Sequence, residues 1–225
     1  EREVAGQGHG KEMTVATGYG DNASFAAVYG SALGQIGLNV YHYTVPENAI
    51  NDWLVERHLE EYKEPPDLFT AGGMASALAL AAALEKTGGD ANSEALIPAL
   101  EGLKFEGPKG TYFIRPEDHV CEQPMNILKL VNLNPDLNGD GVPEYEFFET
   151  VYVSEYDELG VPCTLTGDYA ARCEGVLARQ TAKGEEQPVG EVLKIGQISM
   201  LSGVMALYGQ QQTRGFELGL EYMSG

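Results

Sequence analysis

Residues 74–84, MASALALAAAL, constrain the fold more than any other feature, because they are apolar on almost every side. Pro65 and Pro66 precede this run, and Gly88 and Gly89 follow it as a C-terminal stop, so it is predicted to be a helix. A helix that is apolar all round must be covered by other elements. The sequence therefore predicts a layered fold with this helix buried.

Strands and helices alternate around this run, and strands dominate later, which indicates an α/β fold. The predicted strands are residues 13–17, closed by a Gly-rich turn at 18–22, then 38–45, 111–115, 126–131 and 145–153. The other predicted helices are residues 48–63, as a surface helix over a sheet, and 93–100.

The last part of the chain holds a separate unit. Residues 176–191 are polar and aperiodic, which predicts a linker. A strand at 192–199 and a helix at 208–223 then form one β-loop-α unit with no following strand. Residues 192–225 cannot bury a core of their own, so they need other strands to cover the helix.

Charge and motifs exclude several function classes. The chain has 14 Lys+Arg against 34 Asp+Glu, a net charge of −20, which excludes a nucleic-acid binder. No stretch approaches the roughly 18 consecutive apolar residues of a membrane span, and residues 1–20 lack the pattern of a signal peptide. The four histidines lie in no HExxH motif, and no nucleophile elbow or phosphate loop is present. We expect a non-enzymatic protein.

Several segments together resemble one family. Residues 193–203, LKIGQISMLSG, and 208–218, YGQQQTRGFEL, resemble the mature N-terminal start of the periplasmic branched-chain amino-acid-binding proteins, the substrate-binding subunits of ABC importers. Further matches are EPPDLF (64–69), AAALEK (81–86), LEGL (100–103), PKG (108–110), RPEDH (115–119) and QPM (123–125). The resemblance implies a type I periplasmic-binding-protein-like α/β fold, a mostly parallel sheet flanked by helices.

The order of the matching segments is circularly permuted and incomplete, because the family's start follows its later part here. We expect residues 1–131 to be part of the second ligand-binding lobe, 132–175 a strand-rich acidic tail, 176–191 the linker and 192–225 the first β-loop-α unit of the first lobe. An incomplete two-lobed architecture follows. A second chain or a missing segment would have to complete the first lobe.

The resemblance also places candidate ligand residues. Ser202 and Tyr208 follow the first strand, and Phe69 corresponds to an aromatic residue that packs on the ligand. Tyr19 falls where amino-acid-binding members carry a glutamate for the ligand ammonium. Asp21 could replace that charge, or the solute could be an aromatic acid, an amide or another small carboxylate. Ordinary packing of Tyr19, Tyr208 and Phe69 is the alternative.

A loop at residues 136–144 has the spacing of a calcium site. Its oxygen ligands would be Asp136, Asn138, Asp140, the Val142 carbonyl and Glu144. Position 12 is Phe147 where an EF-hand has glutamate, and a plain Asn-Gly-Asp-Gly turn is the alternative. Structural calcium is the one expected cofactor, and none is required for solute binding.

Two of the three cysteines, Cys163 and Cys173, lie close together in a polar stretch with few apolar residues. We expect them to form a disulfide in an oxidising compartment, with Cys121 free. If all three were reduced, the protein would belong in a cytoplasm.

These observations favour a periplasmic or extracellular solute-binding protein that hands a small solute to an ABC permease. A ligand-sensing ectodomain or regulator of the same fold is one alternative. A calcium-dependent extracellular structural module is another.

Overall fold

The computed structural model describes residues 16–19, 33–132, 148–182, 218–219 and 221–222. In chain order the elements are β1 (Ala16–Tyr19), β2 (Ile36–Asn39), α3 (Ala49–Tyr62), α4 (Leu68–Thr87), α5 (Ser93–Leu100), β3 (Lys104–Gly107), β4 (Gly110–Ile114), β5 (Cys121–Glu122), β6 (Met125–Leu130), β7 (Phe148–Ser154), the 3₁₀ helix η3 (Gly167–Arg172) and α6 (Cys173–Ala182).

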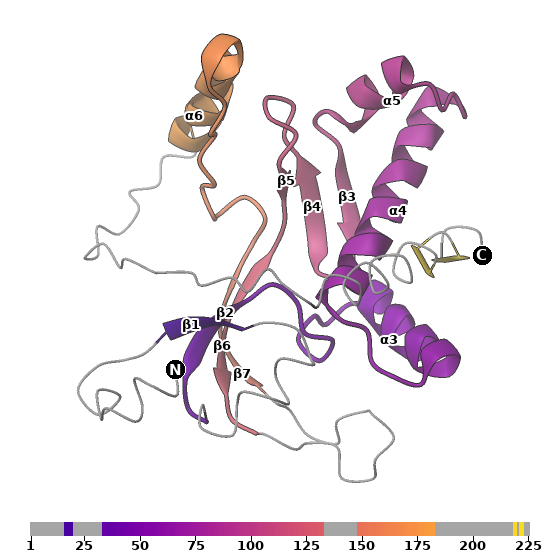
Figure 1. The fold of residues 1–225 in the computed structure, drawn as a ribbon, viewed down its shortest axis with the longest axis vertical. Coiled ribbons are helices and arrows are strands. Elements are labelled where there is room, and N and C mark those ends of the chain that lie inside the picture. The colour runs from indigo at the N-terminus through magenta and orange to yellow at the C-terminus, as the bar shows by residue number, and fades with distance from the viewer. Residues whose placement is uncertain (1–15, 20–32, 133–147, 183–217, 220, 223–225) are drawn as a thin grey trace.

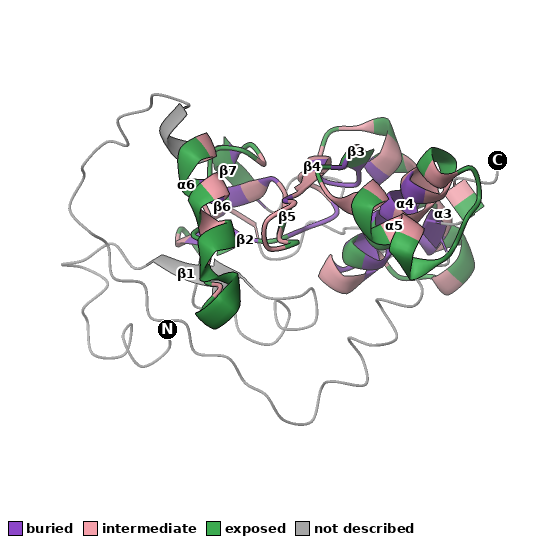
Figure 2. Ribbon diagram, turned by 90° about the horizontal axis from the view of Figure 1, so that it is seen from above, coloured by how far each residue is buried: buried purple, intermediate pink, exposed green. Residues whose placement is uncertain are grey.

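The elements form two groups (Figures 1 and 2). One group is a four-stranded sheet in the order β1-β2-β6-β7. The other is a three-stranded sheet, β3-β4-β5, beside the helices α3, α4 and α5, with α4 packed on α5 and β3. The α/β class is therefore confirmed.

Strand pairing differs from the expected mostly parallel sheet. β1 and β2 are parallel, whereas β2 with β6, β6 with β7, and both pairs of the second sheet are antiparallel. Among the described strands that expectation is wrong. In the second sheet the reason is local: two residues join β3 to β4 and six residues join β4 to β5, too few for a parallel crossover.

The predicted buried helix is confirmed as α4, which begins six residues earlier than the apolar run. The Asp67 carboxylate accepts a hydrogen bond from the Leu68 amide, and Gly88 ends the helix in the left-handed region at φ 67. By length and composition α4 could also cross a membrane. Its packing in the core explains the same composition, since core helices of water-soluble folds pass that test.

Helix α3 is also confirmed, with its ends where the sequence placed them. The Asn48 side chain caps it by accepting the Asn51 amide, and Lys63 ends it at φ 59. Its Leu54 is fully buried and joins a core with Met74 and Leu78 of α4. The helix therefore lies against α4 and not over a sheet as predicted.

The predicted strand at 38–45 is wrong for residues 40–45. Only Ile36–Asn39 is a strand, because the following backbone bonds to a side chain instead of a neighbouring strand. Asn51 Nδ2 donates to the carbonyl oxygens of Tyr43 at 3.0 Å and Pro46 at 3.1 Å. Likewise, Gly18 and Tyr19 belong to β1 and not to a turn.

The predicted linker at 176–191 is helical in its described part, since α6 extends to Ala182. Contacts with the rest of the protein hold this polar helix. Val176 is 1% exposed, and Arg179 forms an ion pair with Glu117 at 2.6 Å. Strands β3 and β5 were not predicted, because they have only four and two residues.

The end of the chain packs on α3 and α4. Leu218 is 2% exposed and belongs to the core of Leu54, Met74 and Leu78. Around it, the rings of Trp53 and Tyr222 lie 5.1 Å apart, edge to face. One core thus joins residues that the sequence division assigns to two different lobes.

Candidate functional site

Three described segments connect the two groups of elements. Residues 40–48 lead from β2 to α3, residues 123–124 lead from β5 to β6, and the chain returns after β7. On that return the Tyr156 ring lies 6.2 Å from the Phe113 ring of β4, and Lys104 of β3 lies over it. We use the name junction for the region where residues 40–48, residues 123–124 and the segment after β7 pass between the two groups.

The β3–β4 turn lies against two of these segments. Asn48 Nδ2 donates to the Pro108 carbonyl oxygen at 3.0 Å. On the other side, a β-carbon at Gly110 would lie 3.6 Å from Cγ of Pro124. Residues 108–110 are therefore a fixed point of the junction.

Buried tyrosines line the segment between β2 and α3. Tyr41 is 2% exposed, and its hydroxyl donates to Asn51 Oδ1 at 2.8 Å. Burial, with a smaller effect of charged Asp67 among others, raises the pKa of Tyr41 above its ordinary value, so it stays a neutral donor. The influence of Asp67 also indicates that the N-terminus of α4 lies close to the junction.

His42 is the buried titratable group of the same segment. Its ring stacks on Tyr43 at 4.6 Å between centroids and meets Phe148 edge-on at 4.9 Å. Because burial disfavours the charged imidazolium, the pKa of His42 falls to about 3. A neutral imidazole is therefore held against β7.

Lys109 lies in the β3–β4 turn and is 9% exposed. Its Nζ donates to Gln123 Oε1 at 3.0 Å and lies 3.6 Å from Met125 Sδ. Both partners are neutral. Burial lowers the pKa of Lys109 from 10.5 to about 7.

Asn39 ends β2 at the carboxyl edge of the parallel pair, opposite Tyr19 of β1 and Asn126 of β6. It is 1% exposed, and among the described residues neither its amide nitrogen nor its amide oxygen has a hydrogen-bond partner. Open α/β sheets place ligands at such carboxyl ends, and an unsatisfied buried amide is costly. Asn39 is therefore a candidate ligand contact.

Of the ligand residues predicted from sequence, the structure describes Phe69 and the backbone of Tyr19. Phe69 is half-buried in the first turn of α4, and Tyr19 pairs with Asn39 at the end of β1. Ser202, Tyr208 and Asp21 lie outside the described residues. Lys109 and Asn39 were not predicted, although Lys109 lies within the PKG match. For Asn39 the available signal was an amide residue between the apolar Leu38 and Val40, whereas Lys109, between Pro108 and Gly110, gave no such signal.

The calcium loop also lies outside the described residues, with all of Asp136, Asn138, Asp140, Val142 and Glu144. It stays a prediction. Within the described part of the chain, no group of three or more His, Cys, Asp or Glu side chains could hold a metal ion.

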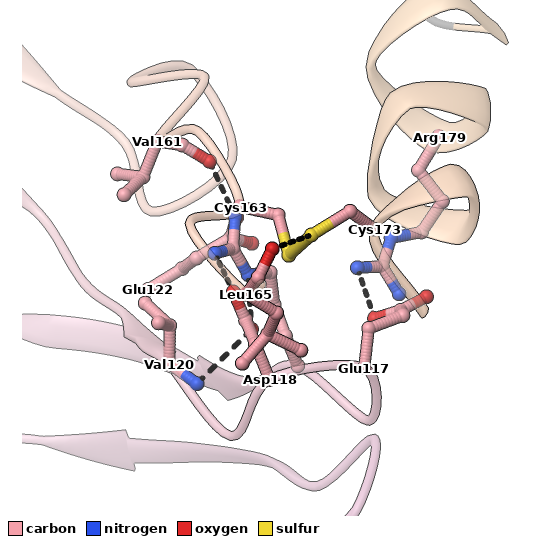
Figure 3. The surroundings of a disulfide bond; sticks show 10 residues. Glu117, Asp118, Val120, Glu122, Val161, Cys163, Leu165, Cys173 and Arg179 are labelled. Atoms are coloured by element: carbon pink, nitrogen blue, oxygen red, sulfur yellow. Dashed lines mark hydrogen bonds and ion pairs between the residues drawn. A yellow bond between two sulfur atoms is a disulfide. The ribbon is translucent and has the colours of Figure 1, made fainter. Parts of the chain in front are cut away.

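Cys163 and Cys173 form the predicted disulfide, and Cys121 is free. Figure 3 shows the disulfide from Cys173, at the start of α6, to Cys163 in the segment after β7. Beside it, Arg179 of α6 pairs with Glu117 of the β4–β5 connection. Nearby, Asp118 and Glu122 pair with the fully buried Arg115. The disulfide thus closes the loop that follows the third connecting segment.

A family model for periplasmic binding proteins matches residues 2–135, more than half of the chain. The protein belongs to this family. The described elements form two groups with three connections, although the sequence division placed residues 1–131 in a single lobe. No curated protein sequence matches the chain.

Solved structures agree with the family. An ABC-type branched-chain amino acid transporter protein from Rhodopseudomonas palustris CGA009 is 35% identical, with a TM-score of 0.56 over 64% of this chain and 36% of its own. A solute-binding protein from R. palustris BisB5, solved with 3,4-dihydroxybenzoic acid, is 25% identical, with a TM-score of 0.52 over 69% of this chain and 41% of its own.

A third structure supports the fold alone. The amino acid ABC transporter substrate-binding protein from Pseudomonas fluorescens Pf-5 is 18% identical, with a TM-score of 0.55 over 76% of this chain and 43% of its own. This periplasmic-binding-protein chain therefore spans less than half the length of these three structures.

Proposed function

We propose that the protein is the solute-binding component of an ABC importer and captures a small solute at the junction. The solute is an amino acid, an aromatic acid or an amide, and it is bound and released unchanged. The observation that carries the proposal is the burial of two polar residues, Asn39 and Lys109, where the connecting segments meet. Among the described residues, Asn39 has no side-chain hydrogen-bond partner and Lys109 has neutral partners. The structures solved for R. palustris proteins support an amino acid or an aromatic acid as the solute.

Hinge closure is the mechanism that fits three short connections. Rotation of a few backbone dihedrals in residues 40–48, 123–124 and the return after β7 would bring the two groups together. A solute that contacts both groups favours the closed state, because only that state offers both sets of contacts. The closed form is then the one that a membrane permease would recognise, outside the cytoplasm.

The test is solute binding by the full-length protein. Calorimetry against leucine, isoleucine, valine and 3,4-dihydroxybenzoate should reveal at least one ligand with a micromolar or lower Kd. Asn39→Leu should weaken that binding by about tenfold, since a polar contact is lost. A matched control is Asn92→Leu, the same substitution at an exposed position immediately before α5, which should leave the affinity unchanged.

The proposal fails if small-angle scattering shows no compaction with any of these solutes and calorimetry detects no heat. An unchanged affinity in Asn39→Leu would remove only the role of Asn39.

A further inference from the structure

We propose that Lys109 is the cationic contact for a carboxylate on the solute, and that the protein therefore selects carboxylates over the matching neutral amides. This inference rests on the proposed function and names the chemical class that the junction takes.

Its position supports this role. Lys109 occupies a turn that is tied to the first connecting segment through Asn48 and Pro108 and lies beside Pro124 of the second. The Tyr112 ring covers the turn so closely that a β-carbon at Gly107 would lie 2.7 Å from its Cε2. The turn is therefore held in place from three sides, as a binding contact requires.

Within the described part of the chain, the Lys109 side chain has no anionic partner. An ammonium group has three N–H donors, and the acceptors present are the Gln123 amide oxygen and the weak Met125 sulfur. Among the described residues, no carboxylate lies within ion-pair distance of Lys109. One donor is thus left for a ligand.

Among the described residues, the two titratable neighbours Cys121 and Tyr112 supply no negative charge at neutral pH either. Burial raises the pKa of the neighbouring Cys121 thiol to about 11 and raises the pKa of Tyr112 above its ordinary value. Both groups are neutral at pH 7. A buried cation without a counter-ion is costly, and a bound carboxylate would relieve that cost.

The cost suggests a functional reason for the lysine. A neutral side chain at position 109 could make the same packing contacts in the turn without burying a charge. A charge-assisted bond to a carboxylate is stronger than a bond to a neutral amide, by enough for a preference of about tenfold or more. Carboxylate selection is therefore the expected consequence.

The experiment compares matched solute pairs by calorimetry on the full-length protein. The pairs are 3,4-dihydroxybenzoate with 3,4-dihydroxybenzamide, and leucine with leucinamide. The wild type should bind the carboxylate of the accepted pair at least about tenfold more tightly, and Lys109→Met should bring the two affinities within about threefold. Lys129→Met, which removes an exposed lysine of β6, should keep the wild-type preference.

A second measurement uses the wild type alone, so it remains informative if the Lys109→Met variant fails to fold. The carbon-13 resonance of Lys109 Cε in the wild type should titrate near pH 7 without solute and at clearly higher pH with the carboxylate bound. A ligand-independent midpoint would overturn the inference.

The remaining outcomes separate the two proposals. A folded Lys109→Met with the wild-type preference, or a wild type that prefers the amide, overturns the carboxylate contact and leaves solute binding standing. A wild type that binds neither member of either pair, nor valine or isoleucine, overturns the proposed function and this inference with it.

Discussion

Arg115 and Val161 lie 46 residues apart in the sequence, yet the Arg115 guanidinium donates a hydrogen bond to the carbonyl oxygen of Val161. The same guanidinium pairs with Asp118 and, at 3.3 Å, with Glu122, and its side chain is 0% exposed. One buried cation therefore links the β4–β5 connection to the segment that returns after β7. Arg115 therefore helps to hold the segment that returns after β7, which is the third connection between the two groups.

Arg115→Met should lower the free energy of unfolding by about 3 kcal/mol, because it leaves Asp118 and Glu122 without their cation. Lys129→Met is the control, since its ion pair with Glu149 is exposed and should contribute under about 1 kcal/mol. Urea unfolding of both variants checks this. Equal losses would show that Arg115 is no more important than a surface lysine.

The disulfide between Cys163 and Cys173 closes a loop with a sequence separation of 10. Replacing both cysteines by serine should cost about 2–3 kcal/mol in the chain-entropy model, whereas Cys121→Ser should cost less. Thiol titration of the wild type in denaturant without reductant should find one free thiol. Three free thiols would contradict the disulfide and the oxidising compartment inferred from it.

Leu218 tests whether the end of the chain belongs to the α3–α4 core. Leu218→Ala should cost about 2–5 kcal/mol, since the side chain is 2% exposed among Leu54, Met74 and Leu78. Leu177→Ala, at a 60% exposed position of α6, is the matched control and should cost far less. If the two variants melt at the same temperature, Leu218 does not pack in this core.

His42 should make the protein less stable in acid. Its pKa is about 3 in the folded protein against 6.5 ordinarily, so between these values the unfolded chain takes up a proton that the folded chain does not. Stability is therefore lost as the pH falls through that window. His42→Gln should lose less stability than the wild type between about pH 7 and pH 4 in urea unfolding. Equal losses would mean that His42 is protonated in the folded protein.

The sequence determined the helices α3 and α4 and the disulfide through local chemistry. Asn48 and Lys63 limit α3, and Asp67 and Gly88 limit α4, because caps act on the backbone within a few residues. The resemblance of several short segments also indicated the correct family. None of this required contacts between distant parts of the chain.

Tertiary structure decided the remainder. Residues 40–45 alternate like a strand, but Asn51 binds the carbonyl oxygens of Tyr43 and Pro46, so the alternation produces a connection. The polar helix α6 is held by the Arg179 pair with Glu117, 62 residues away. Lys109 and Asn39 are ordinary residues in the sequence. The fold makes them candidate ligand contacts by burying them. Among the described residues, Lys109 then has no charged partner and Asn39 no side-chain hydrogen-bond partner, because burial and pairing are properties of the assembled chain and not of its local pattern.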